Sequence, residues 1–270
     1  MEKNPDPAQA LAGMVNASGR LTPVELCRRA REELGIPRAG VRRALKGLVE
    51  RGVFEYACEN ATVFLVPSLA APVGVGRRLF LLRPGQDAAG LPEGALPVVL
   101  REGASFGSGR HPTTRLCLAL IEDAVEALPE GLRDCCLDLG TGSGVLAIAA
   151  VRLGMRSAVA LDLDPSALFE ARENAALNGV DGRIAVSGAD FRGQAGAFGL
   201  ILANLRAPTL FSLLPVFAER LPCGGFLAAS GLHPDEASDY AASAAAFGLS
   251  LAGRRDLGCW SGVSFQKRTG

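Results

Sequence analysis

A run of glycines at every second position is the feature of this sequence best suited to chemistry. Residues 135–144 read CCLDLGTGSG, so a short apolar stretch ends in Gly140, Gly142 and Gly144. The next nine residues, VLAIAAVRL, are almost wholly apolar. This pattern is typical of a buried strand, a glycine turn and a buried helix. Glycine lets the backbone turn sharply and approach a ligand, which the N–H groups at the helix start can bind.

Two aspartates lie at positions that fit the same binding loop. Asp138 stands inside the strand before the glycines, so the spacing is D-x-G-x-G-x-G and not the dinucleotide-binding G-x-G-x-x-G. Residues 159–165, VALDLDP, predict a second buried strand that carries Asp162 at its carboxyl end. A carboxylate there can accept hydrogen bonds from both hydroxyls of a ribose. Asp164 and Pro165 then fit the N-cap and the first residue of a helix.

The composition favours a globular protein of one or two domains. The 270 residues include 28 basic and 28 acidic side chains, so no net charge draws the chain toward nucleic acid or an anionic membrane. Seven cysteines without a C-x-x-C spacing fit small core residues of a reducing compartment better than disulfides or metal ligands. We find no signal peptide and no apolar run of membrane-spanning length. We therefore expect a cytoplasmic protein without a membrane partner or a metal site.

Residues 1–67 are expected to form a separate small domain. Helix start and stop signals, followed by alternating apolar residues, predict three helices and two strands at residues 6–16, 22–34, 38–51, 53–58 and 62–66. Three helices followed by a hairpin are the order of a winged helix-turn-helix. Residues 68–104 hold many Gly, Pro and Ala, and we interpret them as a linker with a small β-hairpin.

The third of these helices carries a basic face, because Arg42, Arg43 and Lys46 point away from its apolar side. This face could bind DNA as a recognition helix does. Residues 1–69, however, hold ten basic and eight acidic side chains, a weak footprint for phosphate contacts. We therefore favour docking of a partner or substrate, or dimerisation, over sequence-specific DNA binding.

Residues 105–270 are expected to form an α/β domain with a Rossmann-like sheet. Beyond the glycine loop, further strands and helices are predicted at residues 199–203, 209–221, 226–230, 235–247, 249–255 and 263–267. Ligands of open α/β sheets bind at the carboxyl ends of the strands. Asn204, directly after one of these strands, therefore lies where a substrate should meet the cofactor. An ordinary turn residue is the alternative at that position.

Four motifs in this order resemble the bacterial ribosomal protein L11 methyltransferase (PrmA) family. They are FGSGRHPTT from Phe106, DLGTGSGVLAIAA from Asp138, DLDP from Asp162 and ENAALNGV from Glu173. The likeness covers about residues 95–268, and it is specific because independent motifs occur in the family's order. It implies a class I S-adenosylmethionine-dependent methyltransferase, with a seven-stranded sheet whose last strand is antiparallel.

The resemblance implies a pocket for S-adenosyl-L-methionine. Residues 106–114 would line the methionine end, the glycines would carry the backbone against the cofactor, and Asp162 would hold the ribose. Asp190, after the third strand, would accept a hydrogen bond from the adenine amino group, with an ordinary loop acid as the alternative. The residues predicted to bind the cofactor are Phe106, Gly107, Thr113, Thr114, Asp138, Gly140, Thr141, Gly142, Gly144, Asp162, Leu163, Asp190 and Asn204.

Asn204 is also the predicted catalytic residue. Its side-chain oxygen can orient the lone pair of an attacking amine in a dry site that lowers the pKa of that amine. The family carries Asn-Ile-Leu-Ala here, whereas residues 204–207 read Asn-Leu-Arg-Ala, so Arg206 departs from the pattern. The family's usual N-terminal domain, which docks the ribosomal protein, is not recognisable either. Docking on that protein is therefore not part of the prediction.

We predict a methyltransferase that N-methylates a ribosomal or other cytosolic protein, on a lysine or an N-terminal amine. A small-molecule methyltransferase with a winged-helix dimerisation domain is the first alternative, so a homodimer is left open. A DNA-binding regulator with a cofactor-sensing methyltransferase-like domain is the second.

Overall fold

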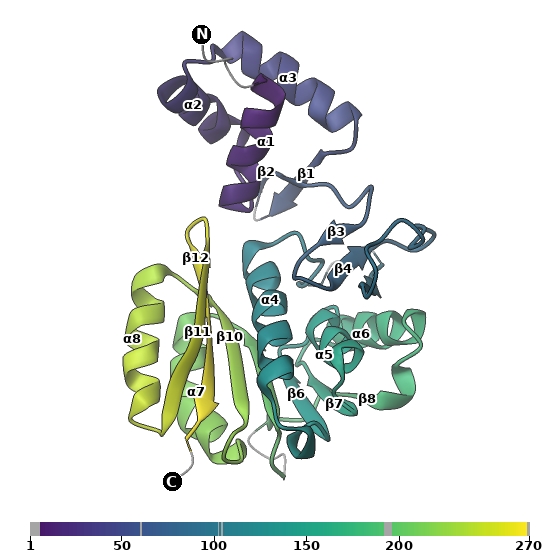
Figure 1. The fold of residues 1–270 in the computed structure, drawn as a ribbon, viewed down its shortest axis with the longest axis vertical. Coiled ribbons are helices and arrows are strands. Elements are labelled where there is room, and N and C mark those ends of the chain that lie inside the picture. Colours follow the sequence, from purple (N-terminus) through teal and green to yellow (C-terminus); the bar gives the residue numbers. More distant parts are fainter. Residues whose placement is uncertain (1–5, 60, 102, 104, 192–195, 269–270) are drawn as a thin grey trace. The chain divides into compact units, whose positions relative to one another are not determined.

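The computed structural model describes residues 6–59, 61–101, 103, 105–191 and 196–268. The chain divides into two compact units, residues 1–73 and 74–270. Figure 1 colours the N-terminal unit from purple to blue and the C-terminal unit from blue through teal to yellow. Residues 74–101, which the sequence predicts as part of a linker, therefore belong with the C-terminal unit.

The N-terminal unit consists of three helices and an antiparallel hairpin. Their bounds are α1 Pro7–Ser18, α2 Pro23–Leu34, α3 Arg38–Glu50, β1 Phe54–Glu59 and β2 Thr62–Pro67. Asp6 and Thr22 cap the first two helices, because their side chains accept hydrogen bonds from Ala8 N and Glu25 N. One side of each helix meets the hairpin in a core that includes the fully buried Leu11, Leu26, Val41 and Leu65. This is the order of elements expected of a winged helix.

The C-terminal unit is built on a seven-stranded sheet in the order β11-β12-β10-β9-β6-β7-β8. Its strands are β6 Cys135–Leu139, β7 Ser157–Leu161, β8 Ile184–Ser187, β9 Leu200–Asn204, β10 Phe226–Leu232, β11 Leu249–Leu257 and β12 Trp260–Lys267. The strands from β10 to β8 pair in parallel, and β12 is antiparallel to both β10 and β11. The predicted Rossmann-like sheet with an antiparallel last strand is confirmed.

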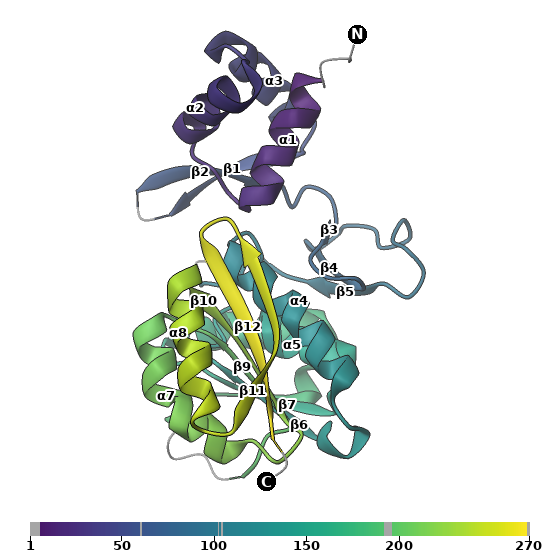
Figure 2. The same ribbon diagram turned by 60° about the vertical axis from the view of Figure 1, so that its left-hand side comes forward.

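Helices cover both faces of this sheet. They are α4 Pro112–Ala127, α5 Val145–Leu153, α6 Pro165–Leu177, α7 Ala207–Arg220 and α8 Pro234–Ala245, with short 3-10 turns at Glu130–Leu132 and Asp181–Arg183. Figures 1 and 2 show α4, α5 and α6 on one face and α7 and α8 on the other. The core beneath α7 and α8 contains the fully buried Ile201, Phe217, Leu227, Tyr240 and Phe265. This two-sided cover explains why β6, β7 and β9 are continuous apolar runs.

A small three-stranded sheet lies near the start of the C-terminal unit. Its strands are β3 Val73–Gly74, β4 Leu79–Leu82 and β5 Leu96–Val99. Because β4 and β5 pair in parallel, these two strands do not form a hairpin with each other. A hairpin needs a tight turn between its strands, whereas residues 83–95 are long enough to return to the same end of the sheet.

Buried polar side chains hold this small sheet against the helices. Asn178, at the end of α6, accepts a hydrogen bond from Val99 N at 2.9 Å and donates one to Val99 O at 2.7 Å. Glu122 of α4 accepts from Arg77 N at 2.6 Å and from Arg78 N at 2.8 Å. Charge-assisted bonds of this kind fix backbone position strongly. Residues 74–101 are thus an integral part of the C-terminal unit.

Among the residues that the structure describes, no helix is long and apolar enough to cross a membrane. Within the same ranges, no three His, Cys, Asp or Glu side chains form a group that could hold a metal ion.

Candidate functional site

The glycine loop after β6 has the conformation that its sequence predicts. Gly140, Gly142 and Gly144 have φ values of 71°, 52° and 82°, in the left-handed region that favours glycine. The N–H of Gly140 donates to Leu161 O at 2.8 Å, which ties the loop to the end of β7. A Cβ at Gly142 would lie 2.3 Å from Phe106 O. The glycines therefore allow both the turn and the close approach of a second backbone segment.

Asp138 is fully buried beneath this loop. Its Oδ2 accepts hydrogen bonds from Thr141 Oγ1 at 2.6 Å and from Ala147 N at 3.1 Å. Its Oδ1 has no partner among the described residues. Burial, together with the negative charge of Asp162, raises the pKa of Asp138 to about 6, although its two hydrogen bonds act in the opposite direction. Through these bonds Asp138 joins the strand, the loop and the helix. Its contact with the cofactor remains a prediction.

Asp162 lies half-buried at the carboxyl end of β7, beside the loop. Its Oδ2 accepts from Gly142 N at 2.9 Å and its Oδ1 from Asp164 N at 3.0 Å. Each carboxylate oxygen has a second lone pair, so these bonds leave acceptor capacity for a diol. Asp164 caps α6 through Ser166 N at 2.9 Å, as predicted. Leu163 is 84% exposed and so presents apolar surface next to this carboxylate.

The segment before α4 lies across the glycine loop. Ser143 N donates to Phe106 O and Ser143 Oγ to Gly107 O, both at 2.9 Å. Gly107 has a φ of 104°, and a Cβ there would lie 2.7 Å from Ser143 Oγ. The Phe106 side chain is 52% exposed, and its ring centroid lies 5.1 Å from that of His111. The structure therefore brings the backbone of this segment against the loop, and the cofactor contact of the Phe106 ring remains a prediction.

Asn204 ends β9 and faces the start of α4. Its Nδ2 lies 3.4 Å from the hydroxyl of the fully buried Thr114, and no described residue donates to its Oδ1. The neighbouring Leu205 reaches the loop, because its Cδ2 would lie 2.6 Å from a Cβ at Gly140. Thr113 is also buried, with its hydroxyl 2.7 Å from Nδ1 of the N-cap residue His111. Both threonines are buried, and their contacts with the cofactor remain predictions.

The remaining residue of the predicted cofactor site is Asp190. Asp190 follows β8 and is exposed, whereas the next residue, Phe191, is buried in the core. Asp162 N donates to Ser187 O at 3.3 Å, so the ends of β7 and β8 lie side by side. The adenine contact of Asp190 remains a prediction.

The sequence analysis did not identify the residues of α6 that hold the segment before α4 against the glycine loop. Asn174 of α6 donates to Ser143 O at 2.8 Å and accepts from Arg101 N at 3.0 Å. Glu170, one turn earlier, accepts from Ser105 N at 3.2 Å. The available signal was the spacing of Glu170, Asn174 and Asn178, which puts three polar side chains on one side of a helix.

Fold and site together define the class. A sheet in this order, with β12 antiparallel, a glycine loop after β6 and an aspartate after β7, is the arrangement of class I methyltransferases. A model of the ribosomal protein L11 methyltransferase (PrmA) family matches residues 68–268. The chain belongs to this family, which confirms the resemblance seen in its motifs.

Individual relatives are similar over the same part of the chain. The ribosomal protein L11 methyltransferase of Pelobacter propionicus is 39% identical over 198 residues, which are 73% of this chain and 63% of that protein. That of Trichlorobacter lovleyi is 42% identical over 162 residues, or 60% and 53%. The crystal structure of a ribosomal protein L11 methylase from Lactobacillus delbrueckii subsp. bulgaricus matches 74% of this chain and 100% of that chain, at 28% identity and a TM-score of 0.65. The chain thus spans less than two thirds of these curated relatives, and residues 1–67 lie outside the family match.

Proposed function

We propose that this protein transfers a methyl group from S-adenosyl-L-methionine to an amine of a protein, either a lysine side chain or an N-terminal amine. The observation that carries the proposal is Asn204, whose Nδ2 is engaged by Thr114 while its Oδ1 is left to accept, at a strand end adjoining the glycine loop. Relatives named as ribosomal protein L11 methyltransferases support a protein substrate. The proposed partner is a ribosomal or other cytosolic protein.

The residues around the loop fit the cofactor chemically. Gly140 and Gly142 supply the left-handed backbone that this loop requires, and the Asp162 carboxylate retains lone pairs for the ribose hydroxyls. Exposed Leu163 and Phe106 offer apolar surface for the adenine and for the methionine end. When bound, S-adenosyl-L-methionine supplies a methyl group on a positively charged sulfur.

The chain's contribution to the reaction is alignment and desolvation. Asn204 Oδ1 would accept a hydrogen bond from the amine and so direct its lone pair, and Thr114 keeps the amide from turning. A dry site lowers the pKa of a lysine amine, which must arrive neutral. The amine nitrogen forms the new N–C bond as the C–S bond breaks. The electron pair of the C–S bond passes to sulfur, and the methylated amine releases a proton to solvent.

The test is incubation of the full chain with cofactor labelled in the methyl group and with fractionated lysate. The proposal predicts labelled protein bands that are much weaker with Asn204→Ala. Labelled small molecules without labelled protein would instead favour the small-molecule enzyme. A salt-sensitive DNA footprint without any transfer would favour the regulator.

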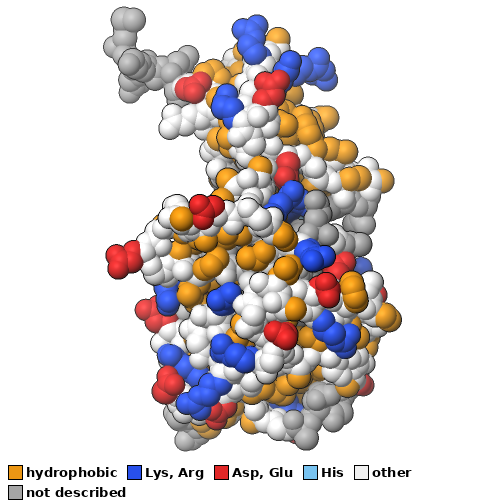
Figure 3. All heavy atoms as spheres, turned by 90° about the vertical axis from the view of Figure 1, so that its right-hand side faces the viewer, with side chains coloured by type: hydrophobic (Ala, Val, Ile, Leu, Met, Phe, Trp, Pro, Cys, Tyr) orange, Lys and Arg blue, Asp and Glu red, His pale blue; other side chains and the backbone are white. Residues whose placement is uncertain are grey.

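For the N-terminal unit we propose a role in selecting the substrate. A groove of about 1000 Å³ between α2, α3 and β1 has buried Val41 and Leu45 in its floor. Arg31, Arg38 and Arg42 line it, and no described acidic residue pairs with them. Figure 3 shows Lys and Arg side chains beside hydrophobic ones at the top of the view, on this unit. Such a groove suits an acidic segment of the substrate protein with apolar side chains.

Removing the N-terminal unit tests this role. A shortened protein should begin at Gly74, because β4 and β5 share a sheet and Glu122 holds the backbone before β4. We expect it to bind S-adenosyl-L-methionine with unchanged affinity in calorimetry and to lose most activity toward the natural protein substrate. Full activity of the shortened protein would leave the unit without a substrate role and favour dimerisation.

A further inference from the structure

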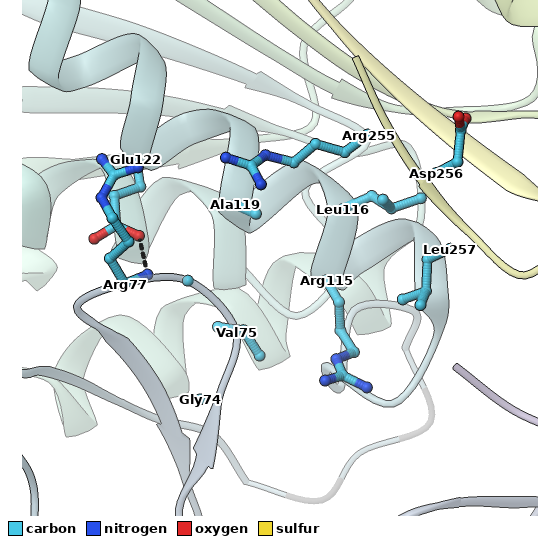
Figure 4. A pocket seen from close by; sticks show the side chains of 11 residues that line it. Gly74, Val75, Arg77, Arg115, Leu116, Ala119, Glu122, Arg255, Asp256 and Leu257 are labelled. Carbon is cyan, nitrogen blue, oxygen red and sulfur yellow. Dashed lines mark hydrogen bonds between the residues drawn. The ribbon is translucent and has the colours of Figure 1, made fainter. Parts of the chain in front are cut away.

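A cavity of about 370 Å³ lies in the C-terminal unit and shares no lining residue with the predicted cofactor site. Its wall comes from residues 74–77, the first part of α4 and the end of β11 (Figure 4). Arg115, the residue after Thr114, extends into it from α4. We call it the Arg115 cavity.

The other charged groups around the Arg115 cavity have partners within the protein. Arg77 and Arg255 both pair with Asp123, at 2.5 Å and 2.6 Å. The Glu122 carboxylate accepts from two backbone N–H groups of the neighbouring segment, and Asp256 pairs with an arginine two positions before it on β11. These contacts pair the charged side chains at the cavity's rim with one another or with backbone N–H groups, and none of them involves Arg115.

Arg115 differs from these neighbours. Among the residues that the structure describes, none accepts a hydrogen bond from its guanidinium, and its Nη1 is buried without a partner. Burial also lowers the pKa of this guanidinium. Figure 4 shows it well apart from the carboxylates of Glu122 and Asp256. A partly buried arginine without a counter-charge is costly, and a carboxylate would offset that cost by accepting two parallel N–H bonds.

Apolar side chains narrow the choice of anion. The same cavity is lined by Val75, Leu116, Ala119 and Leu257. A phosphate is polar on all sides, so part of it would face these side chains without a hydrogen bond. A carboxylate on an aliphatic stem matches both the guanidinium and the apolar wall.

The cavity adjoins the end of the site where the acceptor amine is expected. On α4, the residue before the arginine is Thr114, whose hydroxyl lies 3.4 Å from Asn204 Nδ2. On the opposite wall, Leu257 pairs in register with Trp260 of β12. The Trp260 ring in turn lies 5.3 Å from the ring of His111, at the start of α4. The cavity and the proposed amine position thus both involve the first turn of α4.

We propose that the Arg115 cavity binds the carboxylate of an aspartate or glutamate side chain in the protein substrate, close in sequence to the methylated amine. The inference rests on the proposed protein methylation and narrows its substrate class. Protein segments with an acidic residue near the acceptor amine become the preferred substrates.

The carboxylate site is tested first without any methyl transfer. Calorimetry on the full chain measures binding of isovalerate, a short aliphatic carboxylate, and of the matching amide, isovaleramide. We expect the acid to bind about tenfold more tightly than the amide, since only the acid pairs with the guanidinium. Arg115→Met should abolish this preference, whereas the control Arg156→Met should keep it, because Arg156 does not line the cavity. Equal binding of acid and amide, or an unchanged preference in Arg115→Met, overturns the site.

Kinetics then test whether the carboxylate belongs to the substrate. With the protein that the wild-type enzyme labels in lysate, Arg115→Met should raise KM about tenfold, with kcat and cofactor affinity unchanged. The KM of Arg115→Lys should lie between those of the wild type and Arg115→Met. Isovalerate should compete with the protein substrate. An unchanged KM despite isovalerate binding would mean that the cavity serves a free carboxylate, which overturns the substrate assignment. Failure of the wild-type enzyme to label any protein would overturn the proposed function itself, whatever isovalerate does.

A purely structural arginine is distinguished by stability. Arg115→Met removes a buried charge that lacks a partner, so its unfolding midpoint should equal or exceed that of the wild type. A lower midpoint together with an unchanged KM would overturn the proposal.

Discussion

The two units of the chain use their charged side chains differently. In the C-terminal unit, Asp138, Asp162 and Glu122 are buried or half-buried, and each accepts a hydrogen bond from backbone N–H groups near the site or the small sheet. In the N-terminal unit, charges pair along helix surfaces, as in Arg28 with Glu32 at 2.8 Å. Surface pairs of this kind contribute only about 0.3–0.5 kcal/mol to stability.

This difference separates construction of a site from recognition of a partner. In the C-terminal unit, carboxylates accept hydrogen bonds from backbone N–H groups and so fix the glycine loop in place. Charge in the N-terminal unit holds little in place, so Arg31, Arg38 and Arg42 are available for an external ligand. Substitutions of charged residues in the C-terminal unit should therefore change stability and catalysis. Those in the N-terminal unit should change only the affinity for the substrate.

The largest effect is expected for Asp138→Asn. Asp138 is protonated more readily in the folded state, where its pKa is about 6, than in the unfolded state, where it is 3.8. The free energy of unfolding therefore falls as pH rises from about 4 to 6, by on the order of 3 kcal/mol for a pKa shift of this size. Asn mimics the neutral acid, so the variant should match the wild type at pH 4 and exceed it at pH 7. Fluorescence of Trp260, the single tryptophan of the sequence, reports the unfolding of this unit.

A control for that measurement is Asp164→Asn. Hydrogen bonds from Ser166 lower the pKa of this exposed carboxyl, so its stabilising contribution is lost as pH falls and the sign reverses. If Asp138→Asn shows the same pH profile as the wild type, the carboxylate is not charged and buried as described.

Asn204→Ala should come next in size. We expect kcat to fall about 100-fold, since a small misplacement of the amine costs that much, while the Kd for the cofactor stays unchanged. Single-turnover assays with calorimetry separate the two quantities. Loss of cofactor binding without a separate turnover defect would contradict the orienting role.

Asp162→Ala should weaken cofactor binding by roughly 1.5 to 3 kcal/mol, because bonds to a charged acceptor are lost. It also frees the N–H of Gly142, so the loop loses part of its order. Asp190→Ala should have a smaller effect, about 1 kcal/mol, since it removes one hydrogen bond at an exposed position. Calorimetry with S-adenosyl-L-methionine and its demethylated product measures both. Unchanged affinity in Asp162→Ala would show that the ribose lies elsewhere.

The smallest effect is expected from reversing the charges of Arg42, Arg43 and Lys46 to Glu. KM for the protein substrate should rise several-fold and its salt dependence should flatten, with kcat little changed. Arg43→Glu alone is the matched control, because Arg42 lines the groove of the N-terminal unit and Arg43 does not. Identical kinetics in the triple variant would remove the contrast between the units.

Much of the fold could be predicted from the sequence because its signals are local. Glycines at 140, 142 and 144 permit the left-handed backbone that a sharp turn needs, and all three adopt it. Continuous apolar runs predict strands covered on both faces, and caps such as Thr22 and Asp164 mark where helices begin. The same local motifs were sufficient to place the chain in its family.

The tertiary structure alone decided which distant residues meet. Asn204 lies beside Thr114 across 90 positions, and Asn174 joins Ser143 to Arg101 across 31 and 73. Asn178 likewise binds the backbone of β5, and Glu122 binds the backbone just before β4, although both are far from those strands in sequence. Periodicity and turn chemistry describe neighbours along the chain and carry no information on such pairings, because those depend on which buried polar groups find partners once the core has formed.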